Sequence, residues 1–285
     1  MKAQLIDGKR ISAEIKAEAA EEAAALKANG ITPCLAVVLV GDDSASQVYV
    51  NNKKKACEAV GIRSVSHVLS GGTTEEALLE LIAKLNADKD IHGILVQMPV
   101  PKQIDERKVI LAIDPKKDVD CFHPVNVGNL HTGGEGFLPC TPAGIIELIK
   151  RSGHSIEGKQ CVVIGRSNIV GKPVAMLLMQ ENGTVTICHS KTKNLAEICR
   201  GADIIVSAVG KVNTVTADMV KEGAILIDVG MNRNEAGKLC GDVDFENVKE
   251  IAGAITPVPG GVGPMTIAML MKNCNTAAKI QNGLK

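Results

Sequence analysis

Short apolar runs alternate with longer amphipathic segments along this chain, and that alternation limits the folds open to it. In the first half, strands are predicted at Leu35–Val40, Val65–Leu69 and Gly93–Gln97, and helices at Gly8–Asn29, Ser44–Val60 and Thr74–Ala87. Strands that alternate with helices form parallel sheets, because two parallel strands need a long, right-handed crossover between them. The first half therefore predicts an αβα domain.

The same alternation resumes after a stretch rich in Pro, Gly, His and Asn at Asp114–Pro142. Further strands are expected at Gln160–Ile164, Val185–His189, Asp203–Ala208, Ala224–Val229 and Gly253–Thr256. This is the pattern of a doubly wound, Rossmann-like domain, and a helix at Thr266–Gln281 is expected to return to the first domain. At 285 residues we expect an α/β protein of two domains, residues 1–138 with 266–285 and residues 139–265.

Composition argues against several classes of protein. The 32 Lys and Arg residues balance 32 Asp and Glu residues, so no overall charge draws the chain to nucleic acid. No apolar run is long enough to span a bilayer, and the N-terminus lacks the apolar core of a signal peptide. We expect a soluble, cytoplasmic protein with no membrane partner.

The nine cysteines stand singly, with no Cys-x-x-Cys pair and no zinc-finger spacing. Several lie in apolar runs, where cysteine packs as a small hydrophobic residue. We expect reduced thiols without a catalytic role, and no metal site.

A glycine turn follows the predicted strand Gln160–Ile164. The residues Gly165-Arg-Ser-Asn-Ile-Val-Gly171 lead from that strand into a helix, where backbone N–H groups can bind a pyrophosphate. The usual Gly-x-Gly-x-x-Gly spacing is incomplete, so the turn alone also fits a plain strand-to-helix connection. The surrounding alternation favours a dinucleotide site.

The next strand indicates which dinucleotide is bound. NAD-specific sites usually place Asp or Glu at the end of that strand, where it binds the ribose 2′-hydroxyl. Here the strand ends in His189-Ser190-Lys191, so no carboxylate would repel a 2′-phosphate. Arg166 could bind that phosphate with its fork of donors, assisted by Ser190. The pattern predicts NADP as the cofactor.

The only tyrosine, Tyr49, lies four residues before Lys53 on a predicted helix, so the two side chains share one face. Lys53 also begins a run of three lysines that could simply be solvated. Gln97 ends a buried strand at the edge where open α/β sheets bind ligands, and Asp120 follows in the loop before the second domain. Asp118 and Asp120 could instead cap turns.

The segment Pro257–Thr266, Pro-Val-Pro-Gly-Gly-Val-Gly-Pro-Met-Thr, contains six prolines and glycines and no charge. Proline fixes φ and glycine permits positive φ, so the segment predicts a rigid, shaped loop. Such a loop fits either a tight connector or the wall of a binding site.

Together these motifs resemble the bifunctional methylenetetrahydrofolate dehydrogenase/methenyltetrahydrofolate cyclohydrolase family. The matching stretches are Tyr49-Val-Asn-Asn-Lys53, Gly93-Ile-Leu-Val-Gln97-Met-Pro99, Gly165-Arg-Ser-x-Ile-Val-Gly-x-Pro173, Cys188-His-Ser190 and Pro257–Thr266. The resemblance covers essentially the whole chain. It implies that NADP takes a hydride from 5,10-methylenetetrahydrofolate, and that water then opens the methenyl cation to 10-formyltetrahydrofolate.

The resemblance also implies roles for single residues. Lys53 would be the catalytic residue with Gln97 as its partner, and Asp120 would bind the pterin. Further substrate contacts would be Tyr49, Ser46, Pro259, Gly260 and Gly261, and cofactor contacts would be Gly165, Arg166, Ser167, Ser190 and Met231. The Pro257–Thr266 loop would line a cleft between the domains, and the chain would form a homodimer.

One residue departs from the family pattern. The family usually has glycine after the second aspartate of Lys-Asp-Val-Asp, whereas this chain has Cys121. If that position needs a positive φ, the cysteine strains the loop by about 1 kcal/mol or more.

Three other functions can be compared with the sequence. The same fold could have only one of the two activities at a significant rate. A non-catalytic NADP-binding protein would keep Gly165 and Arg166 but would have no use for Lys53 and Gln97. A dehydrogenase for a small amino or hydroxy acid would need a cationic clamp for a carboxylate, which the first domain does not offer.

Overall fold

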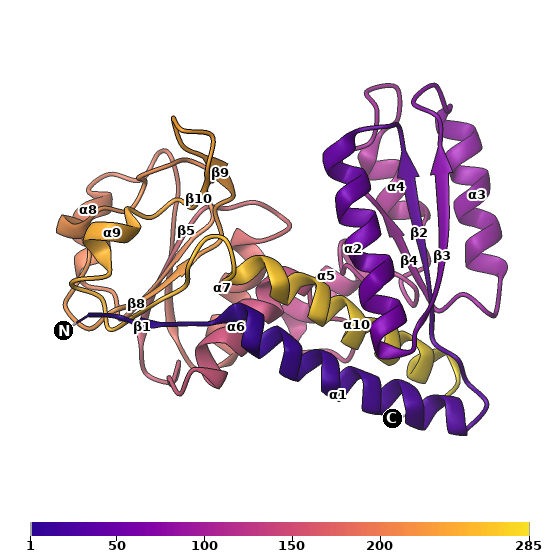
Figure 1. Cartoon of the computed structure of the whole chain (residues 1–285), viewed down its shortest axis with the longest axis horizontal. Coiled ribbons are helices and arrows are strands. Elements are labelled where there is room, and N and C mark those ends of the chain that lie inside the picture. Colours follow the sequence, from indigo (N-terminus) through magenta and orange to yellow (C-terminus); the bar gives the residue numbers. More distant parts are fainter. Residues whose placement is uncertain (1, 285) are drawn as a thin grey trace. The chain divides into compact units, whose positions relative to one another are not determined.

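The computed structural model describes residues 2–284, apart from the side chains of residues 44–46. The chain divides into two compact units, which are each drawn in Figure 1. The six-strand unit comprises the residues up to Ala13 and Thr141–Thr266. The three-strand unit comprises Glu14–Cys140 and the residues from Ile267 onward. Helices α1 (Gly8–Ala28) and α10 (Val262–Gln281) each have residues in both units.

The three-strand unit is built on a parallel sheet in the order β3-β2-β4. Its strands are β2 (Cys34–Val40), β3 (Arg63–Leu69) and β4 (Gly93–Val96). Every residue of β2 and β4 is buried, which explains why both are continuous apolar runs rather than alternating ones. The helices of the unit are α2 (Ser44–Val60), α3 (Glu75–Ala87), α4 (Glu106–Ala112) and α5 (Pro124–Thr132).

Helix α3 covers one face of this sheet. It begins after Thr74, whose hydroxyl accepts the N–H of Ala77 at 3.2 Å. Its buried side chains Leu78, Ile82 and Leu85 recur at helical spacing and pack against alternate residues of β2. The strand and helix patterns read from the sequence thus produce the expected layers.

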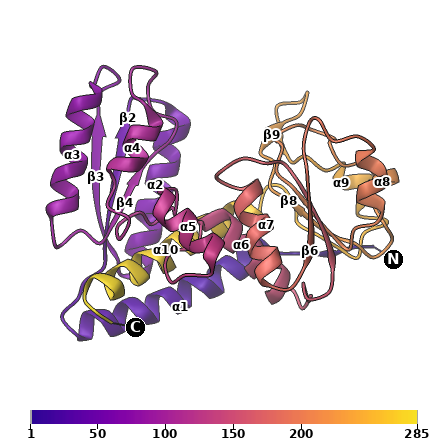
Figure 2. The same ribbon diagram turned by 180° about the vertical axis from the view of Figure 1, so that it is seen from behind.

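The C-terminal helix α10 runs beside α1 (Figures 1 and 2). Asn275 of α10 donates a hydrogen bond to the carbonyl of Ala19 in α1 at 2.8 Å. Most of α10 therefore belongs with the residues of the first half of the chain, and the expectation that the last helix returns to the first domain is confirmed.

The six-strand unit holds a sheet in the order β1-β11-β8-β7-β5-β6, in which all strand pairs are parallel. Its strands are β1 (Gln4–Leu5), β5 (Gln160–Ile164), β6 (Thr184–Cys188), β7 (Ile204–Ser207), β8 (Ile225–Asp228) and β11 (Ala254–Ile255). A short antiparallel pair, β9 (Asn232–Arg233) and β10 (Leu239–Cys240), follows β8.

The helices of this unit are α6 (Cys140–Arg151), α7 (Gly171–Gln180), α8 (Leu195–Arg200), the 3₁₀ turn η1 (Ala217–Met219) and α9 (Phe245–Val248). Val162 and Ile164 of β5 pack into a core with residues of α8, η1 and α9. Because β6 lies on one side of β5 and β7 on the other, the connections reverse direction at β5. In open parallel sheets a ligand binds at the carboxyl end of such a strand.

The structure differs from the sequence expectation at three places. The N-terminal strand β1 pairs with β11, so the residues up to Ala13 lie with the second sheet rather than in a domain starting at residue 1. The stretch Asp114–Pro142, whose content of Pro, Gly, His and Asn is typical of a loop-rich segment, contains helix α5. Helix α10 begins at Val262 rather than Thr266, so only Pro257–Gly261 of the Pro/Gly segment precedes the helix.

Candidate active site

Lys53 lies on the buried side of helix α2. It follows the buried Val50 by three residues and precedes the buried Cys57 by four, which puts all three on one face of the helix. Its neighbours Lys54 and Lys55 are exposed, whereas Lys53 is only partly accessible. Lys53 is therefore not one of three equivalent solvated lysines.

Gln97 follows strand β4 and faces Lys53. The Nζ of Lys53 donates a hydrogen bond to Oε1 of Gln97 at 2.9 Å. The side-chain amide of Gln97 also donates from Nε2 to the carbonyl of Met98 at 3.0 Å, and the backbone N–H of Gln97 donates to the carbonyl of Val38 at 2.8 Å, which fixes the main chain. These bonds fix the orientation of the amide, so that its oxygen meets the lysine.

Asp120 joins this pair electrostatically. Burial raises the pKa of Asp120, the positive charge of Lys53 lowers it, the negative charge of Asp118 raises it, and a hydrogen bond with Cys140 lowers it. Lys53, Gln97 and Asp120 therefore form one group within the three-strand unit. Asp120 also lines a small crevice with residues of β4 and with Phe122.

Asp118 has a different role from Asp120. Its carboxylate accepts the N–H groups of Phe122 at 3.2 Å and His123 at 2.8 Å, and the side-chain amide of Asn126 at 2.8 Å. It is buried and holds the turn that leads into α5. The turn-capping role that the sequence left open for both aspartates is thus the role of Asp118.

Two other predicted substrate residues lie near the start of α2. Tyr49 is one helical turn before Lys53 and is 42% exposed, so its ring can contact a ligand. Ser46 falls within α2, but its side chain lies outside the part of the chain that the structure describes.

The glycine turn after β5 fits a dinucleotide. Gly165 has a φ of 124°, and a Cβ there would overlap the carbonyl oxygen of Ala208. The hydroxyl of Ser167 accepts the N–H groups of Val170 and Gly171, both at 3.2 Å, at the start of α7. The turn therefore leaves no room for a side chain at Gly165, as is typical of turns whose backbone approaches a pyrophosphate.

The remaining predicted cofactor residues lie at the carboxyl edge of the same sheet. The side chain of Arg166 is exposed beside the turn, and Ser190 is exposed after the end of β6. His189 and Thr192 close that turn, because the N–H of His189 donates to the Thr192 hydroxyl at 2.8 Å. Met231 follows β8 and is 55% exposed. The side chains of Arg166, Ser190 and Met231 are therefore all accessible at this edge of the sheet.

Two buried carboxylates at this edge escaped the sequence analysis. Asp242 accepts the N–H groups of residues 209–211, at 2.8–3.1 Å, and the hydroxyl of Ser207. Asp228, at the end of β8, accepts three backbone N–H groups, including that of Asp242 at 2.9 Å. Burial raises the pKa of Asp228 to about 6, although the three N–H groups lower it.

This pair of aspartates orders the loops that follow β7 and β8. Its signal in the sequence is the glycine before Asp242, because a Cβ at Gly241 would overlap the carboxylate of Asp228. One glycine and one aspartate form too common a pair to indicate such a role by themselves.

Residues 257–261 lie within the six-strand unit. Gly260 has a φ of 108°, and Pro259 is exposed. Gly261 is buried, and a Cβ there would meet the carbonyl of Pro257 at 2.6 Å. The segment is therefore rigid and shaped, and Gly261 is also required for packing.

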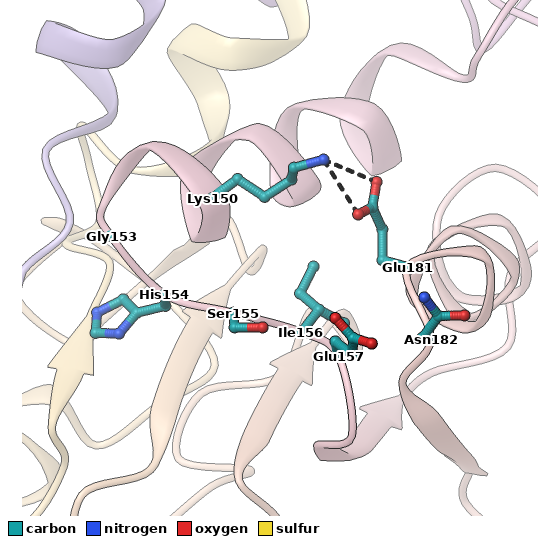
Figure 3. A pocket seen from close by; sticks show the side chains of 8 residues that line it. All are labelled: Lys150, Gly153, His154, Ser155, Ile156, Glu157, Glu181 and Asn182. Carbon is teal, nitrogen blue, oxygen red and sulfur yellow. Dashed lines mark hydrogen bonds and ion pairs between the residues drawn. The ribbon is translucent and has the colours of Figure 1, made fainter.

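A hollow of about 480 Å³ lies elsewhere on the six-strand unit (Figure 3). Lys150 and Glu181 form an ion pair across it at 3.0 Å, and His154 points away from them. The lining residues 153–157 and 181–182 precede β5 and β6, so the hollow lies at the amino ends of these strands. The predicted cofactor residues follow the carboxyl ends, so this hollow is not the dinucleotide site.

The fold and its two polar groups define a dinucleotide-binding α/β enzyme. Residues 139–282 match the NAD(P)-binding domain model of tetrahydrofolate dehydrogenase/cyclohydrolase, and residues 6–120 match the catalytic domain model. The chain belongs to the tetrahydrofolate dehydrogenase/cyclohydrolase family.

Similar proteins cover the whole chain. The bifunctional protein FolD of Acetivibrio thermocellus is 60% identical over 285 residues, which is all of both chains. The crystal structure of the bifunctional FolD methylenetetrahydrofolate dehydrogenase/cyclohydrolase from Campylobacter jejuni is 53% identical, with a TM-score of 0.95, and the match covers 98% of this chain and 99% of that one. The Trypanosoma brucei enzyme, complexed with NADP and an inhibitor, is 42% identical with a TM-score of 0.92, over 98% of each chain.

Among the residues that the structure describes, none of the helices is long and apolar enough to cross a membrane.

Proposed function

We propose that this chain oxidises 5,10-methylenetetrahydrofolate with NADP and hydrolyses the methenyl product to 10-formyltetrahydrofolate, with Lys53, Gln97 and Asp120 as the catalytic group. The observation that carries the proposal is the 2.9 Å hydrogen bond from Lys53 to Gln97, in reach of the charge of Asp120. Membership of the family supports the pair of reactions. A non-catalytic NADP-binding protein would not need this partly buried group.

The chemistry of the three side chains suits the hydrolysis. Lys53 accepts one proton from water as the water oxygen bonds to the methenyl carbon. The bond from that carbon to N5 then breaks, the hydroxyl proton leaves to give the formyl group, and N5 takes up a proton. Gln97 accepts a hydrogen bond from the amine of Lys53 and thereby orients it. Asp120 accepts hydrogen bonds from the amino group and ring N–H of the pterin.

The carboxyl edge of the six-strand sheet is the proposed NADP site. Gly165 and Ser167 would hold the pyrophosphate, and Arg166 with Ser190 would hold the 2′-phosphate. Met231 would supply an apolar contact. When bound, NADP accepts the hydride of the dehydrogenase step.

Further assignments complete the proposal. Tyr49 packs against the folate rings, and Ser46, Pro259, Gly260 and Gly261 are lesser substrate contacts. Residues 1–138 with 266–285 bind folate and residues 139–265 bind NADP, apart from the residues up to Ala13, which lie with the second sheet. The protein is a homodimer of the cytoplasm, as the family resemblance implies, and light scattering would measure its mass in solution.

Substitution of Lys53 by Met tests the mechanism. The cyclohydrolase rate should fall at least about 100-fold, because a positioned base contributes about that much or more. Lys54→Met, which removes an exposed lysine from the same helix, is the matched control and should keep full activity. The assay follows NADPH and 10-formyl product together and measures NADP binding separately. Full turnover in Lys53→Met would rule out the assigned mechanism.

Substitution of Arg166 by Ala tests the cofactor assignment. Loss of a charge-assisted bond to phosphate costs about 1.5–3 kcal/mol, so the KM for NADP should rise by about 10- to 100-fold. Lys159→Ala is the control, because it also removes one exposed positive charge. Lys159 lies before the amino end of β5, whereas Arg166 lies beyond its carboxyl end. An unchanged KM for NADP, or better turnover of wild type with NAD, would contradict the assignment.

A further inference from the structure

Helix α10 presents a buried side-chain amide to the loop that carries Asp120. The Nδ2 of Asn273 donates to the carbonyl of Val119 at 2.7 Å and to the carbonyl of Leu138 at 2.8 Å. Only 6% of Asn273 is exposed. An amide that is buried this deeply and donates twice has a defined orientation, because rotating it would leave polar groups unpaired.

The first of these acceptors is next to Asp120 in the covalent structure. The carbonyl of Val119 and the N–H of Asp120 belong to the same peptide group, which is planar. Fixing the carbonyl therefore fixes the direction in which the chain enters Asp120. The thiol of Cys140 donates to the same carbonyl at 3.4 Å and also bonds to the carboxylate of Asp120.

The loop needs such an anchor. Cys121, the residue after Asp120, has a φ of 61°, a backbone conformation that residues other than glycine rarely adopt. A turn held in this conformation relaxes unless its surroundings determine it. Asn273 supplies a fixed point on one side of Asp120, and the packed Cys121 supplies one on the other.

We infer that Asn273 is a positioning residue, which sets the carboxylate of Asp120 for the pterin by holding the peptide between Val119 and Asp120. The inference rests on the proposed function, because it assumes the pterin contact of Asp120. Asn273 touches no substrate in this account. Its effect passes through Asp120 and concerns folate rather than NADP.

A double-mutant cycle tests the inference. Asn273→Ala should raise the KM for methylenetetrahydrofolate about tenfold and leave the KM for NADP within about twofold. In the Asp120→Asn background, Asn273→Ala should change the folate KM by less than about threefold, because residues that act through one another are not additive. An unchanged folate KM, or the same tenfold effect in both backgrounds, would overturn the inference.

A matched control separates positioning from stability. Asn275 lies two residues further along α10, is fully buried, and donates to Ala19 of α1 instead of the Asp120 loop. Asn275→Ala should lower stability to a similar degree and leave the folate KM unchanged. If Asn273→Ala does not fold, Asn273→Ser retains one donor and should show the same direction of effect in the same cycle.

The outcomes also distinguish this inference from the function on which it depends. Wild type that neither oxidises methylenetetrahydrofolate nor hydrolyses the methenyl cation contradicts the proposed function. Active wild type, with a folate KM that responds to Asp120→Asn and not to Asn273→Ala, contradicts this inference alone.

Discussion

Exchange of Cys121 for glycine and for alanine measures the backbone strain beside Asp120. Cys121 is 2% exposed, has a φ of 61°, and donates its thiol to the carbonyl of Phe137 at 3.2 Å. Both substitutions remove the thiol, and only glycine also removes the Cβ that makes this conformation unfavourable. The difference between the two variants therefore isolates the strain from the loss of the sulfur.

The magnitude follows from three opposing contributions. Loss of the buried alanine methyl costs about 0.8 kcal/mol, and the extra freedom of glycine in the unfolded chain costs about 0.5–1 kcal/mol. Relief of the left-handed conformation returns about 1–2 kcal/mol. We therefore expect the glycine and alanine variants of Cys121 to be equally stable within about 0.8 kcal/mol.

Cys274 provides the matched control. It is fully buried in the middle of α10, where φ is ordinary. Glycine in a helix interior costs about 1 kcal/mol relative to alanine, in addition to the methyl. At Cys274 the glycine variant should therefore be less stable than the alanine variant by about 1.5–2 kcal/mol.

Urea unfolding, followed by tyrosine fluorescence, gives the required free energies. The chain has one tyrosine and no tryptophan, and Tyr49 lies in the same unit as Cys121 and Cys274. The signal thus reports unfolding of the three-strand unit without a contribution from the other unit. A glycine penalty at Cys121 as large as the one at Cys274 would refute the reasoning, because it would mean that the loop stores no strain.

Two further predictions concern the six-strand unit. Burial raises the pKa of Asp228 from 3.8 to about 6. Between these two pH values the carboxyl group loses its proton in the unfolded chain but keeps it in the folded chain. The free energy of unfolding should therefore fall by about 3 kcal/mol as pH rises from about 4 to about 6. A ¹³C NMR titration of the carboxyl group checks this, and ionisation near pH 4 would contradict it. Gly165→Ala should abolish NADP binding, because the added Cβ would overlap the carbonyl oxygen of Ala208. Gly210→Ala is the control: Gly210 has a φ of 73° and open space around it, so the substitution should cost only about 1 kcal/mol of stability. Calorimetric NADP titration and thermal unfolding of both variants measure this.

Much of the fold could be predicted because buried parallel strands are apolar throughout. The predicted bounds Gln160–Ile164 and Ser44–Val60 coincide with β5 and α2. Strand β1, by contrast, has two exposed residues, and only its pairing with β11 makes it a strand. Short exposed elements of this kind have no periodicity from which to predict them.

Helix α5 shows how tertiary contacts override propensity. Its sequence contains Pro, Gly, His and two Asn, which together favour a loop. The helix forms because the imidazole of His123 accepts the N–H of Val125 at 3.1 Å and Pro124 occupies the first turn. The side chain of Asn126 then bonds inward to Asp118. The residues that break a helix pattern are here the ones that start and anchor it.

The candidate site divides in the same way. The face shared by Tyr49 and Lys53 follows from helical spacing, and the position of Gln97 follows from the end of a buried strand. Asn273 could not be found in this way, because its acceptor in Val119 is 154 residues away in sequence and nothing in the local pattern of α10 distinguishes it from Asn275 or the other polar residues of that helix. The sequence thus indicates the groups proposed to face a ligand, and it does not reveal a residue such as Asn273, which is proposed to orient one of them through the backbone.

Asp118 and Asp120 show why that distinction needs the structure. The two residues have the same chemistry and stand two positions apart, so local pattern treats them alike. Asp118 faces N–H donors, which satisfy its charge and commit it to the turn. Asp120 meets the opposing charge of Lys53 instead. A carboxylate whose partner is a side chain, rather than the backbone, can exchange that partner for a substrate, and this difference supports the proposal that Asp120, and not Asp118, contacts the pterin.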